Sequence, residues 1–109
     1  MRRGEVWTVA GGRGYANKPR PAVIVQDNAF AHLPSITICP ISSSFTHLPP
    51  SRIVLEPTAE NGLLNRSAVL TDKITTLEQD RVGKHIGKLS DEDMSEIGLA
   101  LSIFLGLAE

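Results

Sequence analysis

The stretch Lys18-Pro19-Arg20-Pro21-Ala22-Val23-Ile24-Val25 is the best guide to the fold of this chain. Its apolar half, Ala22–Val25, carries no polar residue on either face, which is typical of a short strand buried on both sides. Such a strand lies in the middle of a sheet. The proline-rich half holds Arg20 at the strand entrance, because Pro21 restricts the residue before it to extended geometry.

Arg20 is the first candidate functional residue. A guanidinium held at a strand entrance makes a good clamp for a phosphate or a carboxylate. A solvated loop arginine is the alternative interpretation, and an isolated Arg-Pro pair would favour it. The choice between the two therefore depends on the rest of the chain.

Further short strands are predicted on both sides of this one. Alternating or clustered apolar residues between turn signals mark the segments 5–9, 35–41, 52–55, 67–74 and 84–89. Thr76 to Gln79 has the Thr-x-x-Gln spacing of a capping box, which predicts a short helical turn at that point.

The chain is predicted to end in one helix. Ser90 is a suitable N-cap, the three acidic residues after it favour the first turn, and Gly106 suits the C-terminal stop. Apolar residues recur between them at helical spacing and indicate a core or subunit-interface stripe: Met94, Ile97, Leu101, Phe104 and Leu105. Five or six short strands and one helix predict a mainly β fold, a small barrel with a C-terminal helix.

Length and composition limit the classes of protein to consider. The chain has 109 residues, the usual size of one domain, so we expect a single domain over residues 1–109. No apolar run approaches the roughly 18 residues that span a bilayer, and the N-terminus does not have the pattern of a signal peptide. The single cysteine, Cys39, allows no internal disulfide and no CxxC metal pattern. We therefore expect a cytoplasmic protein that is not associated with a membrane.

Charge is distributed unevenly along the chain. Its formal net charge is −1, which by itself argues against strong nonspecific binding of nucleic acid. Residues 1–26, however, hold five basic side chains against one acidic side chain, a balance of +4, and residues 27–109 hold six against eleven, a balance of −5. This asymmetry either marks one face for an anionic ligand or reflects chance clustering of solvated charges.

Short motifs follow one another in a fixed order along the chain. They are Arg3–Trp7, Arg20-Pro21, Cys39–Ser43, Ser67–Asp72 followed by Thr76-Leu77, and Ile86–Ser90. The ordered set covers nearly the whole chain and resembles the MazF/PemK/Kid toxins. Within it, Cys39–Ser43 is similar to the strand-ending Pro-x-Thr/Ser-Ser motif of that family.

The resemblance implies a fold, an activity and partners. Members of this family are ribosome-dependent or ribosome-independent toxins that cleave mRNA, and each is neutralised by a small antitoxin encoded beside it. Their fold is an SH3-like barrel with a C-terminal helix, similar to that of the CcdB toxins, and they work as homodimers. We therefore expect a homodimer that cleaves single-stranded RNA and binds an antitoxin with an acidic, disordered C-terminal segment.

Metal-free cleavage of RNA needs a base for the 2′-hydroxyl, stabilisation of the pentacoordinate phosphate and an acid for the leaving oxygen. Arg20 suits the second task, since it stays charged and its donors match phosphate oxygens. The resemblance makes it the catalytic arginine. Ser42 stands where relatives have threonine, and it either donates to the same phosphate or only satisfies turn backbone groups. We expect no metal or other cofactor.

The identity of the base stays open. Many members carry a glutamate in the loop before the Arg-Pro pair, where this chain offers Asn17. Asp72 matches an acidic position that some members use in catalysis, although those members also carry an arginine two residues earlier, where this chain has Leu70. The alternatives are the three histidines, none of which is at a motif position: His32, His47 and His85.

Contacts to RNA would come from several residues near Arg20 and Ser42. Arg13, Lys18, Ser43 and Ser44 could hold the backbone, and Tyr15 or Phe45 could stack on a base. Two other functions remain open for the same fold, a gyrase poison like CcdB and a non-catalytic binding module. The first is disfavoured because the chain ends in Gly106-Leu107-Ala108-Glu109 and lacks the terminal tryptophan of those poisons.

Overall fold

A computed structural model describes residues 1–10, 18–45 and 52–108. Its strands are β1 (Glu5–Val9), β2 (Arg20–Ile24), β3 (Ser35–Ser42), β4 (Ile53–Leu55), β5 (Ser67–Val69), β6 (Thr75–Glu78) and β7 (Val82–Lys88). One α-helix, α1 (Asp91–Phe104), follows them, and the 3-10 turns are η1 (Asn28–Phe30), η2 (Thr71–Lys73) and η3 (Gln79–Arg81). The mostly β class with a C-terminal helix is therefore confirmed.

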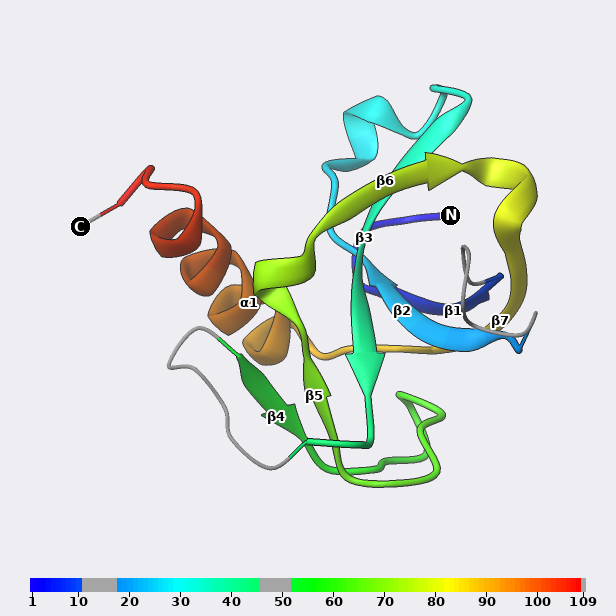
Figure 1. The fold of residues 1–109 in the computed structure, drawn as a ribbon, viewed down its shortest axis with the longest axis vertical. Helices are drawn as coiled ribbons and strands as arrows, with labels where there is room; N and C mark the ends of the chain where they lie inside the picture. Colours follow the sequence, from blue (N-terminus) through cyan, green and yellow to red (C-terminus); the bar gives the residue numbers. More distant parts are fainter. Residues whose placement is uncertain (11–17, 46–51, 109) are drawn as a thin grey trace.

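The strands form one antiparallel sheet, in the order β4-β5-β3-β2-β1-β7, with β6 paired to β3 outside this path. The sheet curls strongly, so that β6 arches over β2 and β3 toward β7, but among the described residues no strand pair closes it into a complete barrel (Figure 1). β2 lies between β1 and β3, with Val23 opposite Val6 on one side and Cys39 on the other. The central position predicted from its apolar run is thus confirmed.

Side chains alternate along the strands, so the curled sheet buries both of its faces. The helix cluster lies between the sheet and α1 and consists of Val6, Val23, Val25, Cys39, Ile41, Leu55, Leu63, Val69, Leu89, Ile97 and Leu101. The strand cluster, on the opposite face, consists of Val9, Ala22, Ile24, Ile36 and Ile38, against which Trp7, Leu77 and Val82 pack.

Helix α1 begins and ends where the sequence predicts. The Ser90 hydroxyl accepts a hydrogen bond from the Asp93 N–H at 3.0 Å, and Gly106 has a positive φ of 75° after the last turn. Ile97 and Leu101 are buried, whereas Phe104 and Leu105 are exposed, so the predicted stripe only partly faces the core. None of the helices among the described residues is long and apolar enough to cross a membrane.

Two local predictions were wrong. Thr76 to Gln79 does not form a helical turn, because Thr75–Glu78 is strand β6, paired with β3. The Thr76 hydroxyl shares a hydrogen bond of 2.6 Å with the Thr37 hydroxyl on β3, so cross-strand pairing replaces the cap. The strand predicted over 67–74 ends at Val69 and passes through Leu70 into η2.

The segment 56–66 approaches β7 very closely. A Cβ at Gly62 would lie 1.9 Å from the Ile86 carbonyl oxygen, and one at Gly87 would lie 2.2 Å from the Asn61 carbonyl oxygen. Asn61 is buried and fixes this segment, since its side chain accepts from the N–H groups of Thr58 and Leu63. Glycine is therefore required at both positions by the contact between two backbones.

Cys39 lies inside the helix cluster and is fully buried. Burial raises the pKa of its thiol to about 12, and the nearby charges of Arg3 and Asp72 act in opposite directions on it. The thiol is therefore protonated throughout the physiological pH range.

Candidate active site

Arg20 and Ser42 lie at the same end of neighbouring strands. Ala22 of β2 pairs with Pro40 of β3, so Arg20 lies two residues before this pair on β2 and Ser42 two residues after it on β3. Arg20 also pairs with Val9 of β1, a member of the strand cluster. Because paired residues point to the same face, both side chains stand at the rim of the strand cluster.

Arg20 is exposed at this rim, and Pro21 behind it is half-buried. Its backbone is part of β2, so the guanidinium is carried by a rigid element rather than by a loop. Lys18, two residues earlier, is also exposed. The other basic and aromatic candidates of this segment, Arg13 and Tyr15, lie outside the described residues.

The serines after β3 form a tight turn. The Ser42 hydroxyl accepts a hydrogen bond from the Ser44 N–H at 3.1 Å and donates to the Ser44 carbonyl at 3.2 Å. Ser42 is half-buried, whereas Ser43 and Ser44 are exposed. The structure thus shows the turn-forming role of Ser42.

Phe45 follows the serines and is half-buried. The guanidinium of Arg66 lies 6.0 Å from the centroid of its ring and is also paired with Glu56 at 2.8 Å. One face of the ring is therefore occupied by a cation, at the limit of a cation–π contact. A base stacked on Phe45 would therefore contact the part of the ring that the Arg66 guanidinium does not cover.

Asp72 comes from a different element of the structure. It lies in η2, which packs against α1 (Figure 1). Ser42 pairs with Ala68 of β5, and the chain then continues past Leu70, whose N–H bonds to Pro40, before it reaches Asp72. Arg20 and Ser42 are thus at the ends of the neighbouring strands β2 and β3, and Asp72 follows β5, the strand with which Ser42 pairs.

Asp72 has a partner, Arg52, that no motif in the sequence indicates. Arg52 donates from Nε and Nη2 to the two carboxylate oxygens of Asp72, at 2.7 and 2.9 Å. This bidentate bond lowers the pKa of Asp72 and raises that of Arg52. Ile53 of β4 pairs with Val69 of β5, and Arg52, which directly precedes β4, reaches Asp72 from this pair of strands.

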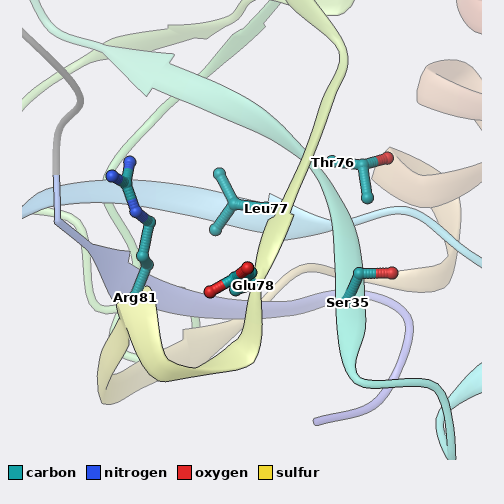
Figure 2. Close-up of a pocket in the computed structure, with 5 residues that line it drawn as sticks. All are labelled: Ser35, Thr76, Leu77, Glu78 and Arg81. Carbon is teal, nitrogen blue, oxygen red and sulfur yellow. The ribbon is translucent and has the colours of Figure 1, made fainter.

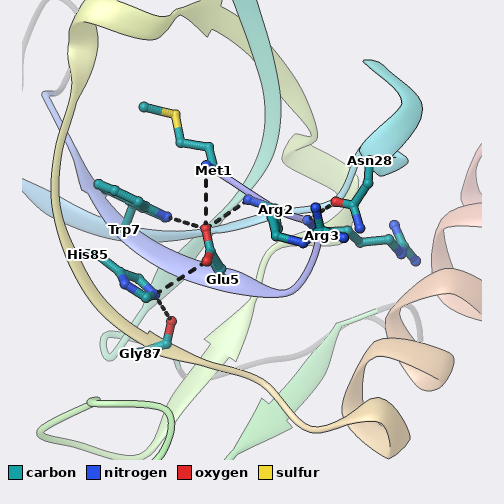
Figure 3. A network of polar contacts seen from close by, with 8 residues as sticks. All are labelled: Met1, Arg2, Arg3, Glu5, Trp7, Asn28, His85 and Gly87. Atoms are coloured by element: carbon teal, nitrogen blue, oxygen red, sulfur yellow. Dashed lines mark hydrogen bonds and ion pairs between the residues drawn. The ribbon is translucent and has the colours of Figure 1, made fainter. Parts of the chain in front are cut away.

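His85 belongs to a different polar network, centred on Glu5 (Figure 3). One Glu5 oxygen accepts from the Arg2 N–H at 2.7 Å and from the Trp7 indole at 3.0 Å, and the His85 ring stacks on Trp7 with centroids 4.9 Å apart. Burial raises the pKa of Glu5, but these hydrogen bonds and the nearby N-terminus outweigh it and leave the pKa lowered. The network joins β1 to β7 and does not include Arg20.

The remaining histidines differ in position. His32 is exposed in the connection between η1 and β3. His47 lies outside the described residues.

A hollow of about 410 Å³ opens beside β6. Ser35, Thr76, Leu77, Glu78 and Arg81 line it, and Figure 2 shows the Leu77 and Arg81 side chains on one side of β6. A second hollow of about 380 Å³ lies near the start of α1 and includes Asn61, Lys88 and Asp93. Neither of these two hollows is lined by Arg20 or Ser42.

Comparison with known proteins agrees with this fold over nearly the full chain. The family model described as "PemK-like, MazF-like toxin of type II toxin-antitoxin system" matches residues 2–105. A "Probable endoribonuclease MazF" of Mycolicibacterium smegmatis is 40% identical over 108 residues, which cover 99% of each chain. "Endoribonuclease MazF9" of Mycobacterium tuberculosis is 32% identical and covers 98% of each.

A solved structure is similar as well. An endoribonuclease from a mycobacterial species, in complex with its cognate antitoxin, superposes with a TM-score of 0.83 at 26% identity and covers 100% of this chain and 98% of its own. The agreement of family model, relatives and fold leads to one conclusion: the chain belongs to the PemK/MazF family of toxins of type II toxin–antitoxin systems.

Proposed function

We propose that this protein is an endoribonuclease toxin that cleaves single-stranded RNA by attack of a 2′-hydroxyl on the adjacent phosphate, without a metal ion. The observations that carry the proposal are the exposed position of Arg20 at the start of β2, beside the strand that ends at Ser42, and relatives of the chain that are named endoribonucleases. The 2′-oxygen forms a bond to phosphorus while the bond to the 5′-oxygen breaks, which gives a cyclic phosphate and a free 5′-hydroxyl.

Arg20 acts on the charge that develops at phosphorus. Its planar donors match the non-bridging oxygens, and a rigid strand keeps them in place before the reaction begins. Ser42 donates its hydroxyl hydrogen to the same phosphate once the bond to Ser44 is given up. Lys18, Ser43, Ser44 and Phe45 extend the surface that the RNA would contact, and Arg13 and Tyr15 would complete it.

Asp72 is proposed as the proton acceptor, although its bond to Arg52 lowers its pKa and makes it a weaker base. Replacing Asp72 by Asn tests this role. If Asp72 accepts the proton, kcat falls strongly and the acidic limb of the pH–rate profile disappears. If Asp72 serves only as the partner of Arg52, the variant loses stability but keeps the pH profile of the wild type, and the assignment fails.

The experiment that tests the function compares the wild type with Arg20→Ala on a long RNA in EDTA. We expect the variant to lose about 100-fold or more in rate, the scale for removing one charge-stabilising donor from a catalytic site. Arg2→Ala, another exposed arginine, serves as the matched control and should cleave normally. Equal cleavage by wild type and Arg20→Ala would refute the catalytic role of Arg20, and no cleavage by either would leave a non-catalytic binding module as the better description.

We also propose that the protein is a homodimer. Leu99, Ile103 and Leu107 are exposed on or just beyond the last turns of α1, together with Phe104 and Leu105. Clustered apolar residues of this kind are typical of subunit interfaces. Sedimentation analysis should give a dimer for the wild type and for Glu92→Gln, at the distant start of the helix, and a monomer for Ile103→Glu.

An antitoxin with an acidic, disordered segment is the proposed protein partner, acting in the cytoplasm. A similar endoribonuclease has been solved with its cognate antitoxin. In this chain, the surplus of positive charge in residues 1–26 suits an acidic peptide as well as it suits RNA. A cognate peptide should compete with RNA, and Lys18→Glu should weaken the binding of both.

A further inference from the structure

The hollow beside β6 is next to the end of β1 that carries the partner of Arg20. Val9 pairs with Arg20 on one side and with Val82 of β7 on the other. Arg81 directly precedes Val82, and its carbonyl accepts a hydrogen bond from the Ala10 N–H at 2.8 Å. With strands spaced about 4.8 Å apart, the backbones of Arg20 and Val82 are about 10 Å apart. One strand of RNA can therefore touch both sites.

The start of β7 is held in place by an irregular pairing with β1. The register shifts between Trp7 and Val9, so that Gly83 and Lys84 share the space opposite Thr8. The Thr8 hydroxyl accepts from the Lys84 N–H at 2.8 Å and lies 2.6 Å from where a Cβ of Gly83 would stand. Bulges of this kind re-aim side chains at the ends of strands, and this one fixes the approach of β7 to the turn that carries Arg81.

The lining of the hollow combines the three kinds of surface that a nucleotide uses. Leu77 is half-buried and offers an apolar wall that is continuous with the strand cluster. Glu78 brings a carboxylate and Arg81 a guanidinium, and Ser35 and Thr76 complete the lining from the other side of β6 (Figure 2). A volume of about 410 Å³ falls within the range of roughly 300–1,000 Å³ for small-molecule pockets.

Glu78 and Arg81 are both exposed at this hollow. Within residues 1–10, 18–45 and 52–108, neither of them makes an ion pair. Two opposite charges that line one hollow without pairing to each other can each meet a complementary group of a ligand. A phosphate suits Arg81, and an amino group suits Glu78.

We propose that this hollow is a subsite for a nucleotide next to the cleaved bond, in which Arg81 binds a phosphate and Glu78 selects an amino-bearing base, cytosine rather than uracil. Cytosine presents an N4 amino donor that a carboxylate accepts, whereas uracil presents a carbonyl oxygen that the carboxylate repels. This inference rests on the proposed ribonuclease function and adds to it a residue that determines sequence preference.

The test uses the full-length protein and two variants that line the hollow. Cleavage sites are first mapped on a long RNA, and short RNAs that differ by C or U at each flanking position are then compared. We expect Glu78→Gln to reduce the C over U preference about tenfold at one flanking position. We expect Arg81→Ala to raise KM about tenfold while kcat changes much less. Asp80→Asn, an exposed neighbour that does not line the hollow, is the control and should match the wild type.

The outcomes separate this inference from the function on which it rests. If the wild type cleaves RNA and Arg20→Ala does not, but both hollow variants keep the KM and sequence preference of the wild type, the subsite is refuted and the ribonuclease function stands. If the wild type cleaves no RNA, both proposals fail. If Asp80→Asn shifts KM or preference as much as its neighbours do, the effect belongs to the fold of η3, and the subsite is refuted.

Discussion

The two buried faces of the sheet differ in what covers their edges. The helix cluster is covered by α1, β4 and the segment 56–66, and its central residues are fully shielded. The strand cluster is enclosed by β6 and β7, and the residues at its edge, such as Leu77 and Val82, are only partly buried. Arg20 and Ser42 stand at that open edge.

This difference predicts that the stability of the fold and the catalytic activity depend on different residues. Substitutions in the helix cluster or its cover should lower the free energy of unfolding and leave the active surface intact. Substitutions at the edge of the strand cluster should change activity more than stability. The first three predictions below test this division, and the fourth concerns the separate Arg52–Asp72 pair.

The largest loss of stability is expected where segment 56–66 meets β7. Gly87→Ala would place a Cβ 2.2 Å from the Asn61 carbonyl oxygen, and neither backbone can move away cheaply. We expect a loss of about 3 kcal/mol or more, measured by urea unfolding. Gly98→Ala on α1 is the control, since its Cβ would meet only the flexible end of Arg3 at 3.4 Å. That change should be neutral or stabilise the helix by up to about 1 kcal/mol.

Truncation of a side chain inside the helix cluster should cause the second-largest loss of stability. Ile97 is fully buried on α1, and Ile97→Ala should cost about 3 kcal/mol through lost burial and the cavity left behind. Cleavage by this variant, measured well below its midpoint of unfolding, should stay within about threefold of the wild type. Leu77→Ala should show the opposite pattern, with a smaller loss of stability and a larger change in KM. If both variants affect activity equally, the division between the two faces is wrong.

The N-terminal cap of α1 should contribute less to stability than these buried residues do. Ser90→Ala removes the hydroxyl that accepts from the Asp93 N–H, and we expect a loss of about 1 kcal/mol. Ser90→Asp keeps an acceptor at the same place and should restore most of the stability. Thermal unfolding followed by circular dichroism distinguishes the two, and an equal loss in both variants would show that the cap does not stabilise α1.

The smallest contribution to stability is expected from the Arg52–Asp72 pair, and this contribution depends on pH. The pKa of Asp72 is lowered in the folded protein, so the pair stabilises the fold above the unfolded pKa of 3.8, and this contribution is lost as pH falls through the folded pKa. Because the pair is partly exposed, we expect about 1 kcal/mol at pH 7. Asp72→Asn should therefore be less stable than the wild type at pH 7, and the difference should shrink below about pH 4. A difference that stays constant down to pH 2 would contradict this assignment.

Much of the fold could be predicted from local patterns. The apolar run Ala22–Val25 is buried in β2 and just beyond it, at the centre of the sheet, and Ser90 and Gly106 mark the ends of α1 as expected. These features depend on residues that are close in sequence. β6 could not be predicted in the same way, because the capping-box spacing of Thr76 and Gln79 is a local signal, and the pairing with β3 that overrides it comes from residues about forty positions away.

The candidate site shows the same limit. Arg20 was evident from its prolines, and its position at the start of a strand that pairs with β3 follows from the register of neighbouring strands. The bond between Arg52 and Asp72 depends on the pairing of β4 with β5, and Arg81 reaches the hollow only through the turn that leads into β7. Contacts of this kind require the register of several strands, which no single motif contains.

The buried thiol of Cys39 can be used to measure how often the sheet opens. A protonated sulfur inside the helix cluster cannot attack a disulfide reagent while the fold is closed, so each reaction records an opening of the structure around β3. The rate of labelling under native conditions then reports how often that region opens. Binding of RNA or of an antitoxin, if it occurs only to the folded form, should slow the labelling in proportion to its occupancy.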